Sequence, residues 1–249
     1  MIISFYCLKT ILLFKKGCLL CLTVFLKIYP KNFFYDKTYV CPMCKKDFTS
    51  KTIRIGKNQP RDIDDDLYTH YALVNPLLYN VITCPHCCYT SLSKTFDKLL
   101  PKQKEWLKHI LFTLQKQNLT PSEHPTIEEA IHKYKLALLI AMTKKSKIGE
   151  QSYLALHIAW LYRELQDSQN EQHFLKKALD GFIETLENET LPILGFDEHT
   201  VMYLLSAISY KLSDMETSKK YLSTLLVASG ISPRIKNRAL DLKTKLKIN

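Results

Sequence analysis

Glycine is scarce in this sequence, since the chain of 249 residues contains only six, and these are widely separated. Neither the dinucleotide-binding pattern G-x-G-x-x-G nor the P-loop pattern G-x-x-x-x-G-K-S/T occurs. Nucleotide enzymes of the Rossmann and P-loop classes are therefore excluded. The metalloprotease pattern H-E-x-x-H and a Ser/His/Asp arrangement are also lacking, so we expect a protein that is not an enzyme.

Long hydrophobic runs are lacking too. Residues 1–30 are apolar but are interrupted by four lysines, and the longest uncharged run, Gly17–Leu26, has 10 residues. A membrane-spanning helix needs about 20. Three interpretations stay open for this segment. It is an extension translated from a misassigned start, a segment that contacts a membrane surface, or an export signal or anchor that lacks the usual small residues for cleavage.

Acidic residues are outnumbered, with 24 Asp and Glu against 35 Lys and Arg, so the net charge is +11. Residues 1–60 alone carry 11 basic and 2 acidic groups. Such an excess permits binding to nucleic acid or anionic lipid without specifying either. The interpretation that we prefer is a lysine-rich, solvated surface.

Cysteine, in contrast, is plentiful, and four of the eight cysteines form two C-P-x-C motifs: Cys41, Cys44, Cys84 and Cys87. Two intervening residues let one tight turn direct both thiolates at one ion, and the proline restricts the turn's backbone. Two such turns supply the four tetrahedral sulfurs that suit structural Zn²⁺. Iron in a rubredoxin-like site is the alternative metal. Two disulfides are less favoured, because paired motifs of this kind bind metal in reducing compartments, so we expect a cytoplasmic protein.

Two residues near the second motif need separate interpretations. We expect the ring of His86 to point away from the metal, since the flanking cysteines fill the ligand positions. Cys88 follows directly, at a position where many such turns carry glycine because the backbone favours positive φ. Lys45 occupies the equivalent position after the first motif. We interpret Cys88 as a buried, inert residue.

The segment between the motifs predicts β structure. Residues 48–55 alternate and are β-branched, residues 78–83 are similar, and together they predict a small antiparallel ribbon with the metal at its turns. The intervening Asp62, Asp64, Asp65 and Asp66 lack EF-hand spacing, so we expect a solvated acidic loop. Nearby aromatic residues either cover the ribbon, which we prefer, or form a base-stacking surface with Lys51, Arg54 and Lys57. These aromatic residues are Tyr68, His70, Tyr71 and Tyr79.

From about Thr95 the apolar residues follow a period near 3.6, which is typical of helices. Capping boxes begin at Thr126, Ser168 and Ser213, and Ser232 precedes a proline at a first helical position. The predicted helices are 96–118, 126–144, 150–166, 169–187, 198–212, 214–228 and 232–247.

Internal similarity favours helix pairs. The segment around Leu165 resembles the one around Leu212, at an offset of 47 residues. Such pairs are similar to tetratricopeptide repeats, although the usual period is about 34; an ordinary helical bundle is the alternative. Trp160, Tyr162, Tyr203 and Tyr210 are then core or groove residues. A groove between stacked pairs would suit a peptide or a helix of another protein.

Several motifs resemble the uncharacterised bacterial domain-of-unknown-function family 2225 over about residues 33–247. They are Tyr35–Thr38, the first C-P-x-C with Phe48, Asn75-Pro76 with Tyr79 and Val81, the second C-P-x-C with Tyr89, and the ending from Ser232 to Lys236. In that family the second motif is usually followed by Gly-Tyr, whereas this chain has Cys88-Tyr89. The resemblance implies a zinc-ribbon-like module followed by tetratricopeptide-like helices, and it implies no activity.

These observations predict a mainly α fold with a small β metal ribbon. We expect an extension at 1–30, a four-cysteine zinc-ribbon-like module at 31–95, and a tetratricopeptide-like helical solenoid at 96–249. The leading hypothesis is a non-enzymatic interaction protein with structural Zn²⁺ and a protein or peptide partner. The alternatives are a nucleic-acid-binding zinc ribbon, through the basic N-terminal half, and a redox-responsive or rubredoxin-like iron protein.

Overall fold

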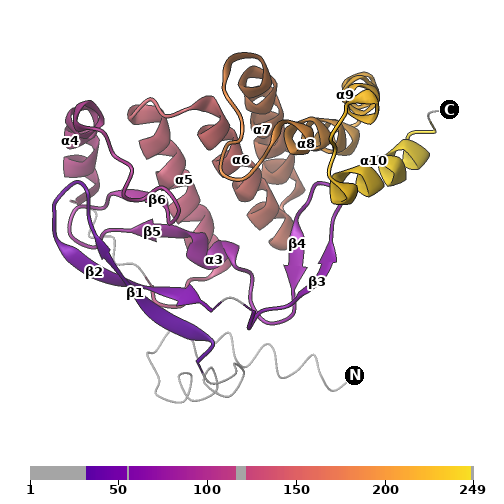
Figure 1. Cartoon of the computed structure of the whole chain (residues 1–249). Helices are drawn as coiled ribbons and strands as arrows, with labels where there is room; N and C mark the ends of the chain where they lie inside the picture. Colours follow the sequence, from indigo (N-terminus) through magenta and orange to yellow (C-terminus); the bar gives the residue numbers. More distant parts are fainter. Residues whose placement is uncertain (1–31, 55, 116–121, 248–249) are drawn as a thin grey trace.

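The structure, a computed structural model, describes residues 32–54, 56–115 and 122–247. The predicted extension 1–30 lies outside the described residues, as do residue 55 of one predicted strand and residues 116–118 of one predicted helix. The described part is mainly helical, with a small antiparallel β region towards its N-terminus (Figure 1). This confirms the predicted fold class.

Each C-P-x-C motif forms the turn of its own β hairpin. β1 (Phe34–Val40) pairs with β2 (Asp47–Ile53) across the first motif, and β5 (Val81–Thr83) pairs with β6 (Thr90–Leu92) across the second. The predicted ribbon between residues 48–55 and 78–83 is therefore wrong. The tight turn at each motif returns the chain directly, so each strand pairs with the strand across its own turn. Residues 77–80 are helical, as α3 (Leu77–Asn80), rather than extended.

A third hairpin lies between the two that carry the cysteines. It consists of β3 (Pro60–Ile63) and β4 (Thr69–Tyr71); Asp62 lies in β3, and Asp64, Asp65 and Asp66 lie at the turn. In Figure 1 this hairpin extends from the β region to the neighbourhood of α8 and α10. The N-terminal β region therefore contacts the C-terminal helices as well as the nearby ones.

Seven longer helices follow among the described residues, close to the predicted ranges. α4 begins at Pro101 rather than at residue 96, because proline is suited to the first turn of a helix. The helices are α4 (Pro101–Gln115), α5 (Ile127–Thr143), α6 (Ile148–Glu164), α7 (Ser168–Asn188), α8 (Glu198–Lys211), α9 (Met215–Val227) and α10 (Pro233–Lys245).

The helix caps test the sequence signals directly. The capping box at Thr126 and the cap at Ser232 are confirmed. The caps predicted at Ser168 and Ser213 are each wrong by one residue, because an aspartate beside each serine performs the role. The Asp167 and Asp214 carboxylates accept the backbone N–H groups of Asn170 and Thr217.

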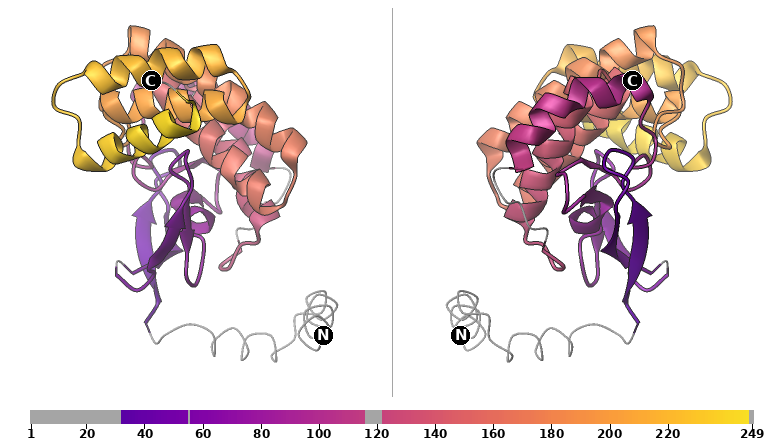
Figure 2. Two further views of the ribbon diagram at one scale, coloured as in Figure 1. Left: turned by 90° about the vertical axis from the view of Figure 1, so that its right-hand side faces the viewer. Right: turned by 90° about the vertical axis from the view of Figure 1, so that its left-hand side faces the viewer.

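Helices adjacent in sequence pack against each other from α4 to α9, and α10 packs against both α8 and α9. Both views in Figure 2 show the helices grouped together, with the β hairpins on one side of the group. Trp160, Tyr162 and Tyr203 are buried in the helical core, whereas Tyr210 is partly exposed. The tetratricopeptide classification and the boundaries at residues 31, 95 and 96 stay predictions. No helix among the described residues has the length and apolarity needed to cross a membrane.

Candidate metal centre

The four predicted cysteines converge from the two hairpins. Their Sγ atoms all lie within 4.8 Å of one another. Cys41 Sγ lies 3.5 Å from Cys87 Sγ, and Cys44 Sγ lies 3.7 Å from Cys84 Sγ. A tetrahedron with four Zn–S bonds of about 2.3 Å has edges of about 3.8 Å. The four cysteines could therefore hold a metal ion, and the donor set suits zinc or iron.

The two turns have the same local geometry. In the first, the Cys41 N–H donates to the Lys46 carbonyl at 3.0 Å and the Lys45 N–H donates to the Cys41 carbonyl at 2.9 Å. The equivalent distances in the second turn are both 2.9 Å. φ is 64° at Lys45 and 58° at Cys88, which confirms the expected positive φ at both positions. This geometry directs backbone N–H groups at the sulfurs.

The electrostatics of the cluster favour a cation. Hydrogen bonding from Cys41 lowers the pKa of Cys84 to about 2, and the same contact raises the pKa of Cys41 to about 12. Cys41 and Cys84 therefore do not ionise independently when no ion balances their charge. Because a thiolate is the form that binds metal, a divalent cation is what would allow all four sulfurs to ionise.

Three of the four cysteines are buried against apolar side chains of the helices, whereas Cys44 is partly exposed. Cys41 and Cys84 are fully buried, and both belong to an apolar core with Leu107 and Leu111 of α4 and Ile140 of α5. Four sulfur ligands would fill a tetrahedral ion and leave no coordination position for water. A closed site of this kind is typical of structural rather than catalytic zinc.

The two residues singled out beside the second turn behave as expected. His86 Nε2 lies 3.3 Å from the Asp47 carbonyl oxygen, so the ring is directed to β2 and not to the sulfurs. The His86 carbonyl accepts a hydrogen bond from Gln115 Nε2 at 2.9 Å, which ties the turn to α4. Cys88 is only 3% exposed and lies outside the sulfur cluster, in agreement with a buried residue.

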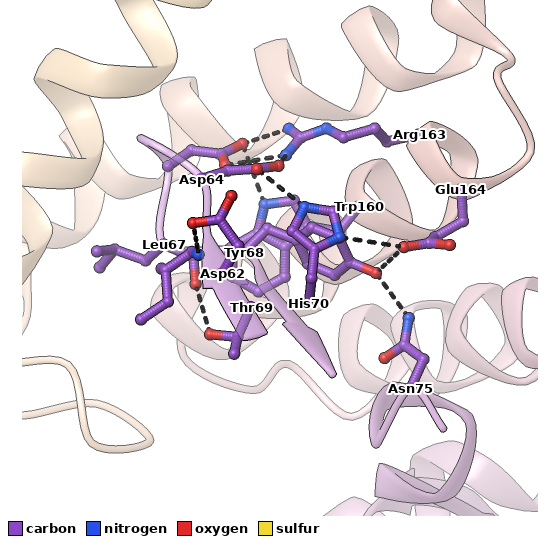
Figure 3. A network of polar contacts seen from close by, with 12 residues as sticks. Asp62, Asp64, Leu67, Tyr68, Thr69, His70, Asn75, Trp160, Arg163 and Glu164 are labelled. Atoms are coloured by element: carbon purple, nitrogen blue, oxygen red, sulfur yellow. Dashed lines mark hydrogen bonds and ion pairs between the residues drawn. The ribbon is translucent and has the colours of Figure 1, made fainter. Parts of the chain in front are cut away.

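The acidic segment of the third hairpin is solvated only in part: Asp62 is exposed, as predicted, whereas the prediction is wrong for Asp66. Asp66 is only 1% exposed and is paired with Arg163 of α6. The Arg163 guanidinium also donates to Asp64 Oδ2 at 2.6 Å, and Trp160 Nε1 donates to Asp66 Oδ2 at 3.1 Å (Figure 3). The sequence shows the four carboxylates but does not reveal their partners, because Arg163 lies 97 residues after Asp66.

Arg163 keeps the buried carboxylate ionised. Burial acts to raise the pKa of Asp66, but the hydrogen bonds and charge of Arg163 outweigh it, and the pKa lies below its usual value. Arg163 Nε also donates to Glu171 of α7 at 2.8 Å. We call Asp64, Asp66, Trp160, Arg163 and Glu171 the arginine network.

The hairpin turn also reaches α8 and α10. Tyr203 Oη donates to the Asp65 carbonyl at 2.6 Å, and Arg238 Nη1 donates to the Asp64 carbonyl at 3.0 Å. Lys245 Nζ lies 2.6 Å from the Asp65 carboxylate. The backbone of one short turn is therefore held by two of the last three helices.

The aromatic residues of this region separate into two groups. Tyr79 covers the first hairpin, with its ring centroid 5.1 Å from that of Phe34, as the preferred interpretation predicted. Tyr68 instead packs on Trp160 of α6 at a centroid distance of 5.5 Å and is buried. Asn75 Nδ2 donates to the Tyr68 hydroxyl at 2.8 Å, and the Tyr68 hydroxyl donates to the Glu164 carboxylate (Figure 3).

Comparison with known proteins places the chain in a family. No curated protein and no solved structure matches the chain significantly. A family model described as an uncharacterised protein conserved in bacteria (DUF2225) matches residues 34–246, which span all three hairpins and every described helix. The chain therefore belongs to this family of uncharacterised bacterial proteins.

Proposed function

We propose that this protein is a non-enzymatic binding protein stabilised by a structural Zn²⁺ ion at the four-cysteine centre. The observation that supports the proposal is the closed set of four sulfurs, within 4.8 Å of one another and contributed in pairs by two separate hairpins. One ion bound there would join the two hairpins to each other. The cysteines supply every ligand, so the centre offers no position at which a substrate could replace water.

The backbone of the two turns would support such an ion. The N–H groups of Met43 and Cys44 lower the pKa of the Cys41 thiol, and those of His86 and Cys87 do the same for Cys84. Hydrogen bonds of this kind offset the negative charge that four thiolates concentrate at one point. Iron in the same site would instead give a rubredoxin-like protein with visible absorption.

Elemental analysis and an absorption spectrum of the purified full chain test the metal. We expect one zinc per chain, lost in the Cys84→Ser/Cys87→Ser variant together with the structure of both hairpins. Cys88→Ser is the matched control, because it removes a neighbouring buried thiol outside the sulfur cluster, and it should retain the zinc. Iron with visible absorption would support the redox alternative. A metal-free wild type, or a double variant that keeps its metal, would overturn the proposal.

We further propose a protein or peptide partner for the helical part, in a reducing compartment such as the cytoplasm. Helices that pack in sequence order, as α4 to α9 do, present an extended surface that suits another chain. Leu139 and Met142 lie one turn apart on α5 and are 42% and 57% exposed, which provides apolar surface for a contact. Crosslinking and capture should recover one partner with the wild type and lose it with Leu139→Glu/Met142→Glu. Equal recovery with both chains would reject this surface.

A further inference from the structure

A cavity of about 340 Å³ lies away from the cysteines, where the third hairpin and α3 meet α6. The loop before α8 and the first turn of α10 complete its wall through Phe196 and Arg234. Its volume falls in the range of about 300–1,000 Å³ that is usual for small-molecule sites. None of the four cysteines lines it, so it is separate from the candidate metal centre.

One face of α6 gives the cavity an aromatic wall. Tyr153, His157 and Trp160 are four and three residues apart, which places their side chains on the same helical face. The ring centroids of Tyr153 and His157 are 4.0 Å apart, and those of His157 and Trp160 are 4.7 Å apart. Phe196, in the loop before α8, packs on Tyr153 with a distance of 5.2 Å between their ring centroids. A wall of adjoining rings suits a flat, aromatic occupant.

His157 supplies a polar group in this apolar setting. The residue is 3% exposed, and its Nδ1 lies 2.7 Å from the Tyr153 carbonyl oxygen. Because a carbonyl can only accept, Nδ1 carries the proton. Burial lowers the pKa of His157 to about 3, so the ring is neutral at physiological pH and Nε2 is a hydrogen-bond acceptor.

Nε2 has no hydrogen-bond donor among the residues that the structure describes. Since the Nδ1 edge faces the backbone of its own helix, Nε2 is the polar atom that His157 offers to an occupant of the cavity. The atom is not sealed from solvent, since the fully buried polar atoms without a partner among the described residues are Tyr89 Oη, Tyr134 Oη and Ser209 Oγ. An N–H group on a bound molecule would donate to Nε2 in place of water.

The charge of the lining favours an anion. With His157 neutral, Arg234 carries the single formal charge among the described residues that line the cavity. None of these lining residues is acidic. Arg234 lies in the first turn of α10, beside the cap residue Ser232, and is exposed. A carboxylate or phosphate near this guanidinium would be attracted without any opposing negative charge in the wall.

We propose that this cavity binds a small, planar aromatic anion that carries a ring N–H group. The ring lies against Tyr153 and Trp160, the N–H donates to His157 Nε2, and the anionic group faces Arg234. The site adds a small ligand to the proposed function and does not depend on the metal.

Calorimetric titration of the full chain with three matched probes tests the proposal. Indoleacetate has the ring, the N–H group and the carboxylate, whereas indole lacks the carboxylate and naphthaleneacetate lacks the N–H group. We expect indoleacetate to bind with a dissociation constant at or below about 1 mM, and each incomplete probe to bind about tenfold more weakly.

Two variants assign the contacts. His157→Phe keeps a ring but removes the acceptor, and it should weaken indoleacetate about tenfold while leaving naphthaleneacetate unchanged. Arg234→Gln, at an exposed position that should not affect folding, should weaken both acids but not indole. His132→Phe, on the exposed face of α5, is the matched control and should bind as the wild type does.

Two results would overturn the proposal. One is the absence of measurable binding of any probe by the wild type. The other is indoleacetate affinity that neither His157→Phe nor Arg234→Gln alters. Either result can occur with one zinc per chain, so this proposal and that of the metal centre fail independently.

Discussion

Two regions of this protein attach β hairpins to helices by different chemistry. At the candidate metal centre, the sulfurs of two hairpins lie together in one apolar core with residues of α4. All four cysteine side chains carry negative charge when they are ionised. At the arginine network, the third hairpin brings its carboxylates to the guanidinium of Arg163 on α6. The first region could hold a cation from outside the chain, whereas the second contains its own cation in Arg163.

The pKa directions follow this difference. Among the thiols, the hydrogen bond between Cys41 and Cys84 raises the pKa of Cys41 to about 12 and lowers that of Cys84. The thiol of Cys41 keeps its proton and donates it to the thiolate of Cys84. In the arginine network the pKa of Asp66 is lowered despite its burial, because Arg163 stabilises the ionised form. The comparison therefore predicts that one attachment depends on metal supply and the other does not.

Metal removal should have the largest effect. A chelator at neutral pH should destabilise the β1–β2 and β5–β6 hairpins by at least about 5 kcal/mol, since structural zinc contributes about 10–16 kcal/mol in small zinc fingers. Hydrogen exchange should show lost protection there and retained protection in β3–β4. Equal loss in all three hairpins would show that the two attachments are not independent.

Breaking the arginine network is the next test. Arg163→Met leaves Asp66 buried without its cation, and we expect the unfolding free energy to fall by about 3–5 kcal/mol in chemical denaturation. Adding Asp66→Asn should recover part of this loss. The exposed Lys176–Asp180 pair on α7 gives the control, because Lys176→Met should cost less than about 0.5 kcal/mol. A similarly small effect for Arg163→Met would contradict the role of the network.

The dependence of stability on pH tests the environment of His157. Its pKa falls from the usual 6.5 to about 3 in the folded protein, so the unfolded chain binds a proton that the folded one excludes. Stability should therefore decrease by about 1.4 kcal/mol per unit as the pH falls from about 6.5 towards 3. His157→Phe should lack this part of the slope, measured as the difference from the wild type at each pH.

The arginine network should not contribute over most of that range. Because the pKa of Asp66 is lowered in the folded protein, its contribution to stability is fully present above the usual pKa of about 4. That contribution is lost only as the pH falls below this value. Identical acid profiles for the wild type and His157→Phe would therefore mean that His157 is not held neutral.

The smallest expected effect lies in the first cysteine turn. Lys45 is exposed and has a φ of 64°, a conformation that glycine adopts without strain. Lys45→Gly should stabilise the metal-loaded protein by up to about 1 kcal/mol in thermal unfolding. Lys46→Gly is the control, because that residue does not have positive φ and should gain nothing. A gain at both positions would argue against relief of strain at residue 45.

The two regions also differed in how well the sequence revealed them. The cysteines were recognisable because a C-P-x-C turn is local, and its ligands are only two residues apart. The helices and the cap at Thr126 were predictable for the same reason. The pairing of Asp66 with Arg163 depends on a fold that joins positions 97 residues apart, so Asp66 was wrongly expected to be solvated. His157, in the same way, lies on an apolar helix and is marked by no local pattern.

X-ray absorption at the zinc edge of the purified full chain tests the central claim most directly. The metal centre described here predicts four sulfur neighbours at about 2.3 Å and no nitrogen or oxygen neighbour. A zinc ion with a mixed shell or with fewer than four sulfurs would contradict the assignment of Cys41, Cys44, Cys84 and Cys87 as a closed ligand set.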